Sequence, residues 1–143
     1  MAMLDITSAN AIVALSVDGL FSTTLEHFSA DSSFTSDTVQ AAETRMGVDG
    51  HMAAGFTPAI KTVTINLEAG SPSLTFMQLL RQAQEANLKP YKVQMVISIP
   101  SIGRRYTFSE GVLQSFKDLP DGQTVLSPSQ WVFHFEGLSV EGL

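Results

Sequence analysis

The stretch that decides the fold reads Lys61-Thr62-Val63-Thr64-Ile65-Asn66-Leu67. Apolar and polar side chains alternate along it without a break, and successive side chains of a β-strand point to opposite faces of a sheet. Val63, Ile65 and Leu67 therefore face one way, and the polar side chains between them face the other. The stretch predicts a half-buried strand whose three apolar side chains belong to the core.

The same alternation recurs further along the chain. Residues 92–99 and 105–112 repeat it, and Trp131, Phe133 and Phe135 form an aromatic stripe with polar or smaller residues between them. Aromatic stripes of this kind are typical of a core-facing strand. We therefore expect three more strands, the last of which contributes three large rings to the core.

A hairpin is predicted near the N-terminus. Residues 11–17 are apolar on both faces, as in a buried strand, and Asp18-Gly19 follows them. This dipeptide is a strong hairpin signal because glycine readily adopts positive φ. We expect residues 20–28 to form the return strand.

One segment, residues 72–87, has helical periodicity instead. Its apolar residues at positions i, i+3, i+4 and i+7 are Phe76, Leu79, Leu80 and Ala83. This spacing predicts a helix with one core-facing stripe. Ser71 is expected to cap its N-terminus, with Pro72 at the first helical position.

Strands, one helix and further strands predict a mainly β (β+α) fold, an antiparallel β-sandwich or barrel with one flanking α-helix at about residues 72–87. At this length we expect a single domain, residues 1–143. The predicted core residues are Val63, Ile65, Leu67, Leu79, Leu80, Trp131, Phe133 and Phe135.

Residues 29–59 are rich in small and polar residues and have only a weak pattern. Gly47-Val48-Asp49-Gly50 in their middle is a turn signal, and residues 40–46 and 51–56 are suited to be the arms of a long hairpin. Either a hairpin protrudes here, at about residues 38–58, or the segment orders only against a neighbouring subunit. A long hairpin with free edges promotes aggregation in a monomer, so this segment favours assembly.

Composition excludes several classes of function. Among 143 residues there is no cysteine, which excludes disulfides, thiolate zinc sites, iron–sulfur clusters and a cysteine nucleophile. The formal net charge of −6 argues against tight binding to nucleic-acid phosphates. Only 15% of the residues are charged, less than the usual quarter, which favours a surface covered by partner subunits. No basic leader and no long apolar run is visible, so we expect no export signal and no membrane span.

The excess negative charge lies entirely in the first 60 residues, which contain seven acids and a single base, Arg45. The acids are Asp5, Asp18, Glu26, Asp31, Asp37, Glu43 and Asp49. They form either a solvated acidic face or a surface that repels another polyanion, and the sequence leaves both readings open.

No arrangement of residues predicts catalysis. The chain has no phosphate-binding glycine loop, no nucleophile elbow and no zinc-protease motif. Its histidines, His27, His51 and His134, lie far apart, and the single basic pair, Arg104-Arg105, is expected to be exposed or salt-bridged. We therefore expect no enzyme, no catalytic residue, no cofactor and no metal site.

Several motifs occur in a characteristic order. Residues 44–52, with the turn Gly47-Val48-Asp49-Gly50, are followed by strand 62–67, by Ser71-Pro72-Ser73 and, near the C-terminus, by Trp131-Val132-Phe133. In this order and spacing the chain resembles the tail tube proteins of contractile-tailed bacteriophages. These proteins carry a G-x-D-G hairpin turn, a T-V-T-I-type strand, a helix that starts at S-P and a W-V-F-type strand. The resemblance covers about two thirds of the chain, from about residue 38 to the end.

The resemblance implies a structural subunit that self-assembles into stacked hexameric rings around a channel for DNA ejection. The hairpin would reach the next ring, and an acidic channel wall would repel the passing DNA. The inter-ring residues implied are Arg45, Met46, Gly47, Asp49, Gly50 and His51, and the candidate acids of the channel wall are Asp37, Glu43 and Asp49.

The implied partners are further copies of the chain, sheath and baseplate proteins, and DNA that passes without specific binding, with no membrane. The implied location is the virion tail, after assembly in the host cytoplasm. Two alternatives stay open. One is a tube initiator or baseplate adaptor, and the other is a small ligand-binding β-sandwich module, for which Trp131 and Tyr106 are the support.

Overall fold

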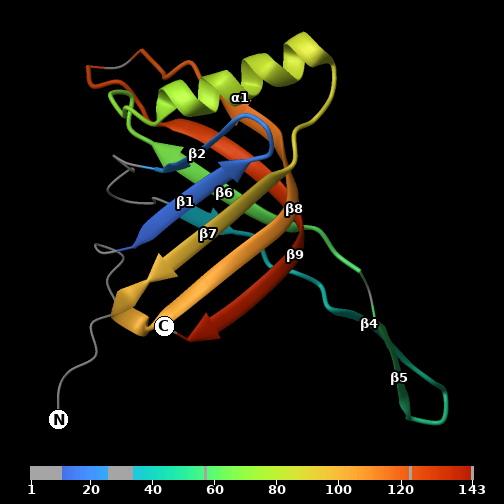
Figure 1. Cartoon of the computed structure of the whole chain (residues 1–143). Coiled ribbons are helices and arrows are strands. Elements are labelled where there is room, and N and C mark those ends of the chain that lie inside the picture. Colours follow the sequence, from blue (N-terminus) through green and yellow to red (C-terminus); the bar gives the residue numbers. More distant parts are fainter. Residues whose placement is uncertain (1–10, 26–33, 57, 123, 143) are drawn as a thin grey trace, which may run out of the picture.

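The computed structural model describes residues 11–25, 34–56, 58–122 and 124–142, and Figure 1 shows how its elements are arranged. In chain order these are β1 (Ile12–Val17), β2 (Phe21–Thr24), β3 (Phe34–Ser36), β4 (Ala42–Met46), β5 (Met52–Phe56), β6 (Lys61–Leu67), α1 (Leu74–Asn87), β7 (Val93–Ile99), the 3-10 helix η1 (Pro100–Ile102), β8 (Arg104–Lys117) and β9 (Ser129–Gly142). The prediction of a mainly β, antiparallel fold with one flanking helix is confirmed.

Seven of the described strands form one antiparallel sheet in the order β2-β1-β7-β8-β9-β6-β3. The long strands β8 and β9 pair along nearly their whole length. β7 pairs with β8 only from Arg104 to Gly111, and β6 pairs with β9 only from Ser129 to Phe135. β8 and β9 therefore connect two halves of the sheet, one extended by β7, β1 and β2 and the other by β6 and β3.

The sheet curls so that its two halves face each other. Phe34 of β3, Val63 of β6 and Ile97 of β7 line one cavity of about 310 Å³, although β3 and β7 lie four strands apart in the sheet. Helix α1 lies across one end of the curled sheet (Figure 1). This arrangement encloses one core between the two halves and the helix.

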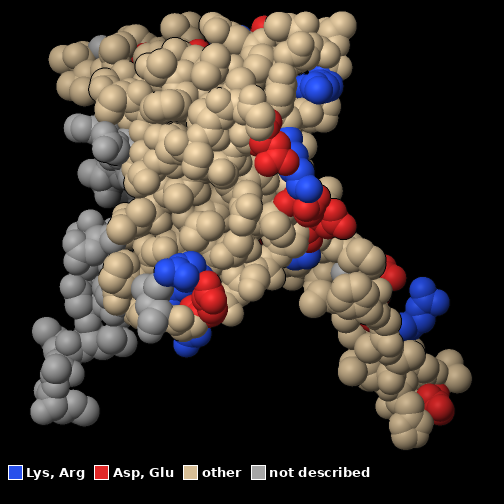
Figure 2. Space-filling model, viewed as in Figure 1, with Lys and Arg blue, Asp and Glu red and all other residues tan. Residues whose placement is uncertain are grey.

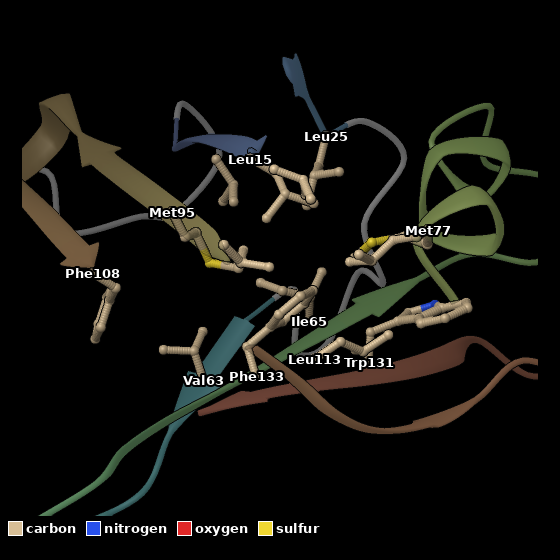
Figure 3. Close-up of a cluster of buried hydrophobic side chains, with 14 of the residues drawn as sticks. Leu15, Leu25, Val63, Ile65, Met77, Met95, Phe108, Leu113, Trp131 and Phe133 are labelled. Atoms are coloured by element: carbon tan, nitrogen blue, oxygen red, sulfur yellow. The ribbon is translucent and has the colours of Figure 1, made fainter. Parts of the chain in front are cut away.

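Side chains from both halves of the sheet and from α1 converge in this core (Figure 3). Seven of the residues predicted for the core are at most 1% exposed: Val63, Ile65, Leu67, Leu80, Trp131, Phe133 and Phe135. Trp131 stacks on Phe116 with ring centroids 5.5 Å apart and donates a hydrogen bond from Nε1 to Ser129 Oγ. The indole is therefore fixed on both its apolar face and its polar edge.

Leu79 does not lie in the core. Its side chain is 42% exposed, whereas Met77 is fully buried. Both residues fit a helical period, but α1 presents the face of Ser73, Met77 and Leu80 to the sheet. Side chains three and four positions apart share a helix face. Because the face with Met77 packs on the sheet, Leu79 points away from it. The placement of Leu79 in the core was wrong.

The start of α1 also differs in detail from the expectation. The helix begins at Leu74, and Ser71 lies in the turn before it. Ser71 Oγ accepts a hydrogen bond from the Ser73 backbone N–H at 3.2 Å, so this hydroxyl stabilises the entry turn and does not cap the helix itself. At the other end Leu88 adopts φ 52° and ends the helix in the left-handed conformation.

The N-terminal hairpin forms as predicted. β1 and β2 pair antiparallel, and Gly19 between them has φ +74°. β2 ends at Thr24, so the expected strand over residues 20–28 is shorter, and its last residues, 26–28, lie outside the described residues.

A bulge interrupts β8 in the middle of the sheet. The register between β7 and β8 shifts between Val93 and Met95, and Glu110 there has φ 56°. The next residue, Gly111, lies directly opposite Phe135, and a Cβ atom at Gly111 would overlap the Phe135 ring. The bulge thus brings the backbone of β8 against a buried aromatic ring, where only glycine fits.

Candidate assembly surfaces

The hairpin β4–β5 projects from the body of the molecule (Figure 1). Its strands pair from Ala42↔Phe56 to Met46↔Met52, and every residue of both strands is exposed. Among the described residues, the strands β4 and β5 make extensive contacts only with each other and not with any strand or helix of the body. The hairpin is therefore an arm whose surface is available to another molecule.

The two faces of this arm differ in chemistry. Directly opposed residues of an antiparallel pair share a face, and neighbouring pairs alternate between faces. One face carries Met46, Met52, Ala54 and Phe56, with Ala42 and Thr44, and the other carries Glu43, Arg45, Ala53 and Gly55. Phe56 is 84% exposed, Met46 67% and Met52 65%. We call the first of these the apolar face of the arm.

The predicted inter-ring residues occupy two kinds of position. Met46 lies on the apolar face and Arg45 on the opposite face. The others form the turn: Gly47 N–H donates to His51 O at 2.9 Å, and the His51 N–H donates to Asp49 Oδ1 at 3.1 Å. Gly50 has φ +83°. Asp49 and Gly50 therefore shape the tip of the arm, and Met52 and Phe56 are the apolar residues that the turn motif did not single out.

Replacing Gly50 by valine is expected to impair assembly and leave the stability of the body unchanged. A β-branched residue at positive φ is strained by about 1–3 kcal/mol, and the arm contributes no core residue. Polymer formation by light scattering and unfolding by denaturant would measure the two effects. Gly55→Val is the matched control, because Gly55 has open space around it and its φ is not positive. Equal loss of folded chain and of polymer for Gly50→Val would contradict the expectation.

Two of the candidate channel acids lie on the arm, and the third lies on the segment that leads into it. Asp37 follows β3, Glu43 lies on β4 and Asp49 lies at the tip. Asp5, Glu26 and Asp31 lie outside the described residues. The assignment of Asp37, Glu43 and Asp49 to a channel wall stays a prediction.

The outer face of the curled sheet is largely uncharged. Its side chains include Ser16, Thr62, Thr64, Asn66, Gln94, Ser98, Thr107, Gln130 and His134. On the face shown in Figure 2, the charged residues gather along one side of the body, near one end of the sheet and on the arm. Most of the visible surface is therefore neutral, as the low charged fraction of the sequence led us to expect.

The charged groups near the bulge pair with one another. Lys92 Nζ lies 2.8 Å from Glu110 Oε1. The hydrogen bond and the charge of Glu110 raise the pKa of Lys92, with smaller contributions from Asp18 and Glu136. Because both partners are about half exposed, this ion pair fixes local geometry more than it stabilises the fold.

The end of the molecule that carries α1 has a second apolar surface, which we call the α1 end. A groove of about 520 Å³ there lies between α1 and the connection from β8 to β9, with Leu74, Phe116, Leu119 and Pro120 among its lining. The exposed apolar residues at this end include Leu79, Leu119, Val125 and Leu126. At the groove Gln78 donates to Asp118, and the Arg81 guanidinium lies 5.5 Å from the centroid of Phe116. The α1 end and the arm lie at opposite ends of the molecule (Figure 1).

Comparison with known proteins assigns the chain to a family. The family described as tail fiber protein gp32 matches residues 4–139, which is nearly the whole chain. The chain belongs to this family. The resemblance to contractile-tail proteins is therefore confirmed at the level of a tail-protein family. No curated protein matches the chain in sequence.

Solved structures show which fold this gp32-family chain adopts. It is similar to a chain of the anti-feeding prophage tube-terminating cap (TM-score 0.64, 9% identity, 100% of this chain and 95% of that chain covered). It is also similar to a chain of the sheath-tube complex of the PVC extracellular contractile injection system (TM-score 0.63, 10% identity, 92% and 88% covered). A third similar chain comes from the anti-feeding prophage baseplate (TM-score 0.58, 15% identity, 99% and 98% covered). At these identities the likeness establishes the fold.

The described part of this gp32-family chain contains no group of three or more His, Asp or Glu residues able to hold a metal. Within that part, no helix has the length and apolar character required to cross a membrane.

The remaining candidate residues are accounted for one by one. The Arg105 guanidinium lies 3.2 Å from the Glu141 carboxylate, and His27 lies outside the described residues. Trp131 is fully buried, so it offers no face to a ligand, whereas Tyr106 lines the cavity of about 310 Å³ between the two halves of the sheet.

Proposed function

We propose that this gp32-family protein is a structural tube subunit that self-assembles into stacked hexameric rings around a channel for DNA. One observation carries the proposal: an arm with an exposed apolar face projects from a fold shared with tube and cap chains. Apolar surface of this kind is unfavourable in water and marks a site of protein contact. The role proposed is geometric and involves no catalysis.

The two ends of the molecule support a head-to-tail stack. The arm presents Met46, Met52 and Phe56 at one end, and the α1 end exposes Leu119 and Leu126 at the other. A contact between two different surfaces repeats along an axis without limit unless it closes into a ring. We infer that the arm of a subunit in one ring is covered by the α1 end of a subunit in the next.

The remaining parts of the proposal follow from this assembly and from the resemblance. Asp37, Glu43 and Asp49 are the candidate acids that would repel DNA in the channel. Sheath and baseplate proteins are the proposed partners of the outer surface. The proposed location is the virion tail, with assembly in the host cytoplasm.

A tube initiator, a terminator or a baseplate adaptor is the second candidate. The fold likeness to a tube-terminating cap chain and to a baseplate chain favours it. A protein of this kind would stack on one side only. Apolar surface at both ends of this molecule favours the repeating subunit instead.

The test is the substitution Phe56→Ser on the apolar face of the arm. Burying a phenylalanine side chain contributes about 1.5–3 kcal/mol, and 1.4 kcal/mol corresponds to a tenfold change in an equilibrium constant. We expect the concentration needed for polymer formation, measured by sedimentation and negative-stain microscopy, to rise roughly tenfold to a hundredfold.

Ala53→Ser is the matched control, because Ala53 lies on the opposite face of the same strand. It should polymerise like the parent chain, which should form hollow rings and tubes. A parent chain that stays monomeric at high concentration would refute the proposal. Rings that never stack would favour the initiator or terminator.

A further inference from the structure

Two methionines lie directly opposite each other on the apolar face of the arm. Met46 ends β4 and Met52 begins β5, and they form the last pair of the hairpin before its turn. Directly opposed side chains of an antiparallel pair are close neighbours, with Cβ atoms about 4.5–5.5 Å apart. Met46 is 67% exposed and Met52 65%. Both side chains therefore belong to one small patch that solvent reaches.

These two side chains differ from the other methionines that the structure describes. The sequence holds six methionines and no cysteine. Met77 and Met95 are fully buried in the core, and Met1 and Met3 lie outside the described residues. Within the described ranges, an oxidant dissolved in water can therefore reach the methionines of the arm and not those of the core.

Oxidation by a peroxide changes what this patch can contact. Hydrogen peroxide transfers one oxygen atom to the lone pair of a methionine sulfur. The S–O bond forms as the O–O bond breaks, the sulfur is oxidised by two electrons, and the peroxide is reduced to water. The product, methionine sulfoxide, is polar and chiral, and it disrupts interfaces that apolar methionines form. Oxidation of the pair would therefore place two polar groups on the apolar face of the arm.

The position of the pair couples this chemistry to assembly. In the proposed stack the apolar face of the arm is covered by a subunit of the next ring. A sulfoxide buried there without a hydrogen-bond partner costs free energy, whereas a thioether already buried there is out of reach of peroxide. Oxidation and stacking therefore oppose each other, because an oxidised arm docks poorly and a docked arm is protected.

We propose that Met46 and Met52 form a paired oxidation site, at which hydrogen peroxide or another hydroperoxide converts free subunits into a form that does not stack. The inference rests on the proposed function, because it requires the arm to make the contact between rings. The change is reversible by methionine sulfoxide reductases, one for each sulfoxide epimer. In the reverse step two thiols are oxidised to a disulfide, and the sulfoxide oxygen leaves as water.

Peroxide treatment followed by peptide mass mapping tests the site itself. In the free chain, Met46 and Met52 should each gain one oxygen atom, while Met77 and Met95 stay unmodified because they are buried. In the assembled chain the two arm positions should react at least roughly tenfold more slowly, since the contact must open before peroxide can enter.

Polymer formation by the treated chain tests the consequence. We expect the oxidised parent to require a concentration at least roughly tenfold higher than the untreated parent, since two apolar contacts are lost. Met46→Gln with Met52→Gln should show a similar increase without peroxide, because its side chains are polar from the start. Treatment of the oxidised parent with both reductases should restore polymer formation.

A double variant separates the arm pair from other effects of peroxide. Met46→Leu with Met52→Leu keeps the face apolar and cannot be oxidised there, but it retains Met1 and Met3. Peroxide should leave its own concentration for polymer formation unchanged. Adding Ala53→Met to this variant is the matched control, because Ala53 is exposed on the opposite face of the arm. This third methionine should be oxidised without loss of polymer.

Three results would overturn the inference. An oxidised parent that polymerises at the same concentration as the untreated chain would mean that the arm tolerates sulfoxides, and the proposed tube function would survive. Equal loss of polymer in the parent and in the leucine double variant would place the sensitive group outside the arm pair. An untreated parent chain that forms no polymer would remove the proposed function together with this site.

Discussion

Replacing Phe133 by alanine is expected to lower the free energy of unfolding by about 3–5 kcal/mol, the range measured for aromatic residues removed from protein cores. Phe133 is fully buried and lies directly opposite Val63 and Leu113 on its two neighbouring strands. Its ring stacks on that of Phe135, with ring centroids 6.2 Å apart. Its neighbours lie on strands in both halves of the sheet. The cavity left by the ring therefore cannot be filled by the movement of a single flexible segment.

Denaturant unfolding of Phe133→Ala would measure this loss in the Phe56→Ser background, in which stacking is weakened. Repeating it at several chain concentrations separates folding from assembly, which would otherwise add to the apparent stability. Gln130→Ala is the control, because Gln130 is exposed on the same strand. A difference below about 1 kcal/mol between Phe133→Ala and this control would place Phe133 outside a rigid core.

Replacing Gly111 by valine is expected to destabilise the fold by about 3 kcal/mol, the upper end of the usual range for an overpacked core. A Cβ atom at Gly111 would overlap the Phe135 ring and lie 2.9 Å from His134 O. The Phe135 ring is 1% exposed and packs against Phe108 with ring centroids 5.3 Å apart. The ring is therefore enclosed by other side chains and has no solvent-exposed side toward which it can move.

The same denaturant measurement applies, with Gly142→Ala as the control. Gly142 also lies in a strand, its φ is not positive, and nothing lies within 4 Å of an added Cβ atom there. Unchanged stability of Gly111→Val would show that β8 can shift at the bulge and that the close approach to Phe135 is not required.

Much of the fold could be predicted because local pattern and tertiary packing agree. Strict alternation in residues 61–67 and the aromatic stripe from Trp131 to Phe135 leave each strand one possible buried face. Gly19 and Gly50 have positive φ, as their turn motifs predict.

The predictions failed where the periodicity is interrupted or ambiguous. From Phe108 to Gly111 to Leu113 the buried residues of β8 are spaced by three and then two, because the bulge at Glu110 inserts a residue. A second irregularity lies between Leu113 and Ser115. It follows directly on residue 112, where the expected strand ended, five residues before the actual end at Lys117. Within α1 two stripes fit the helical period equally well, and only packing against the sheet selects Met77 over Leu79.

The candidate site was predicted in outline and incompletely in its residues. The turn motif located the arm, but a turn indicates where strands reverse and not which face is apolar. Once Met46↔Met52 is known as the first pair, period two assigns Ala54 and Phe56 to the same face as Met46. The register of the hairpin was the missing information.

The paired length of β8 and β9 also has a mechanical consequence. Antiparallel hydrogen bonds lie perpendicular to the strands, so a pull along the strand axis strains the whole β8–β9 ladder simultaneously, in shear. The arm responds differently to force. A pull that separates the ends of β4 and β5 next to the body breaks their pairs one after another, from Ala42↔Phe56 toward the turn. Under tension along the strands, the body would therefore resist rupture while the arm peeled open first.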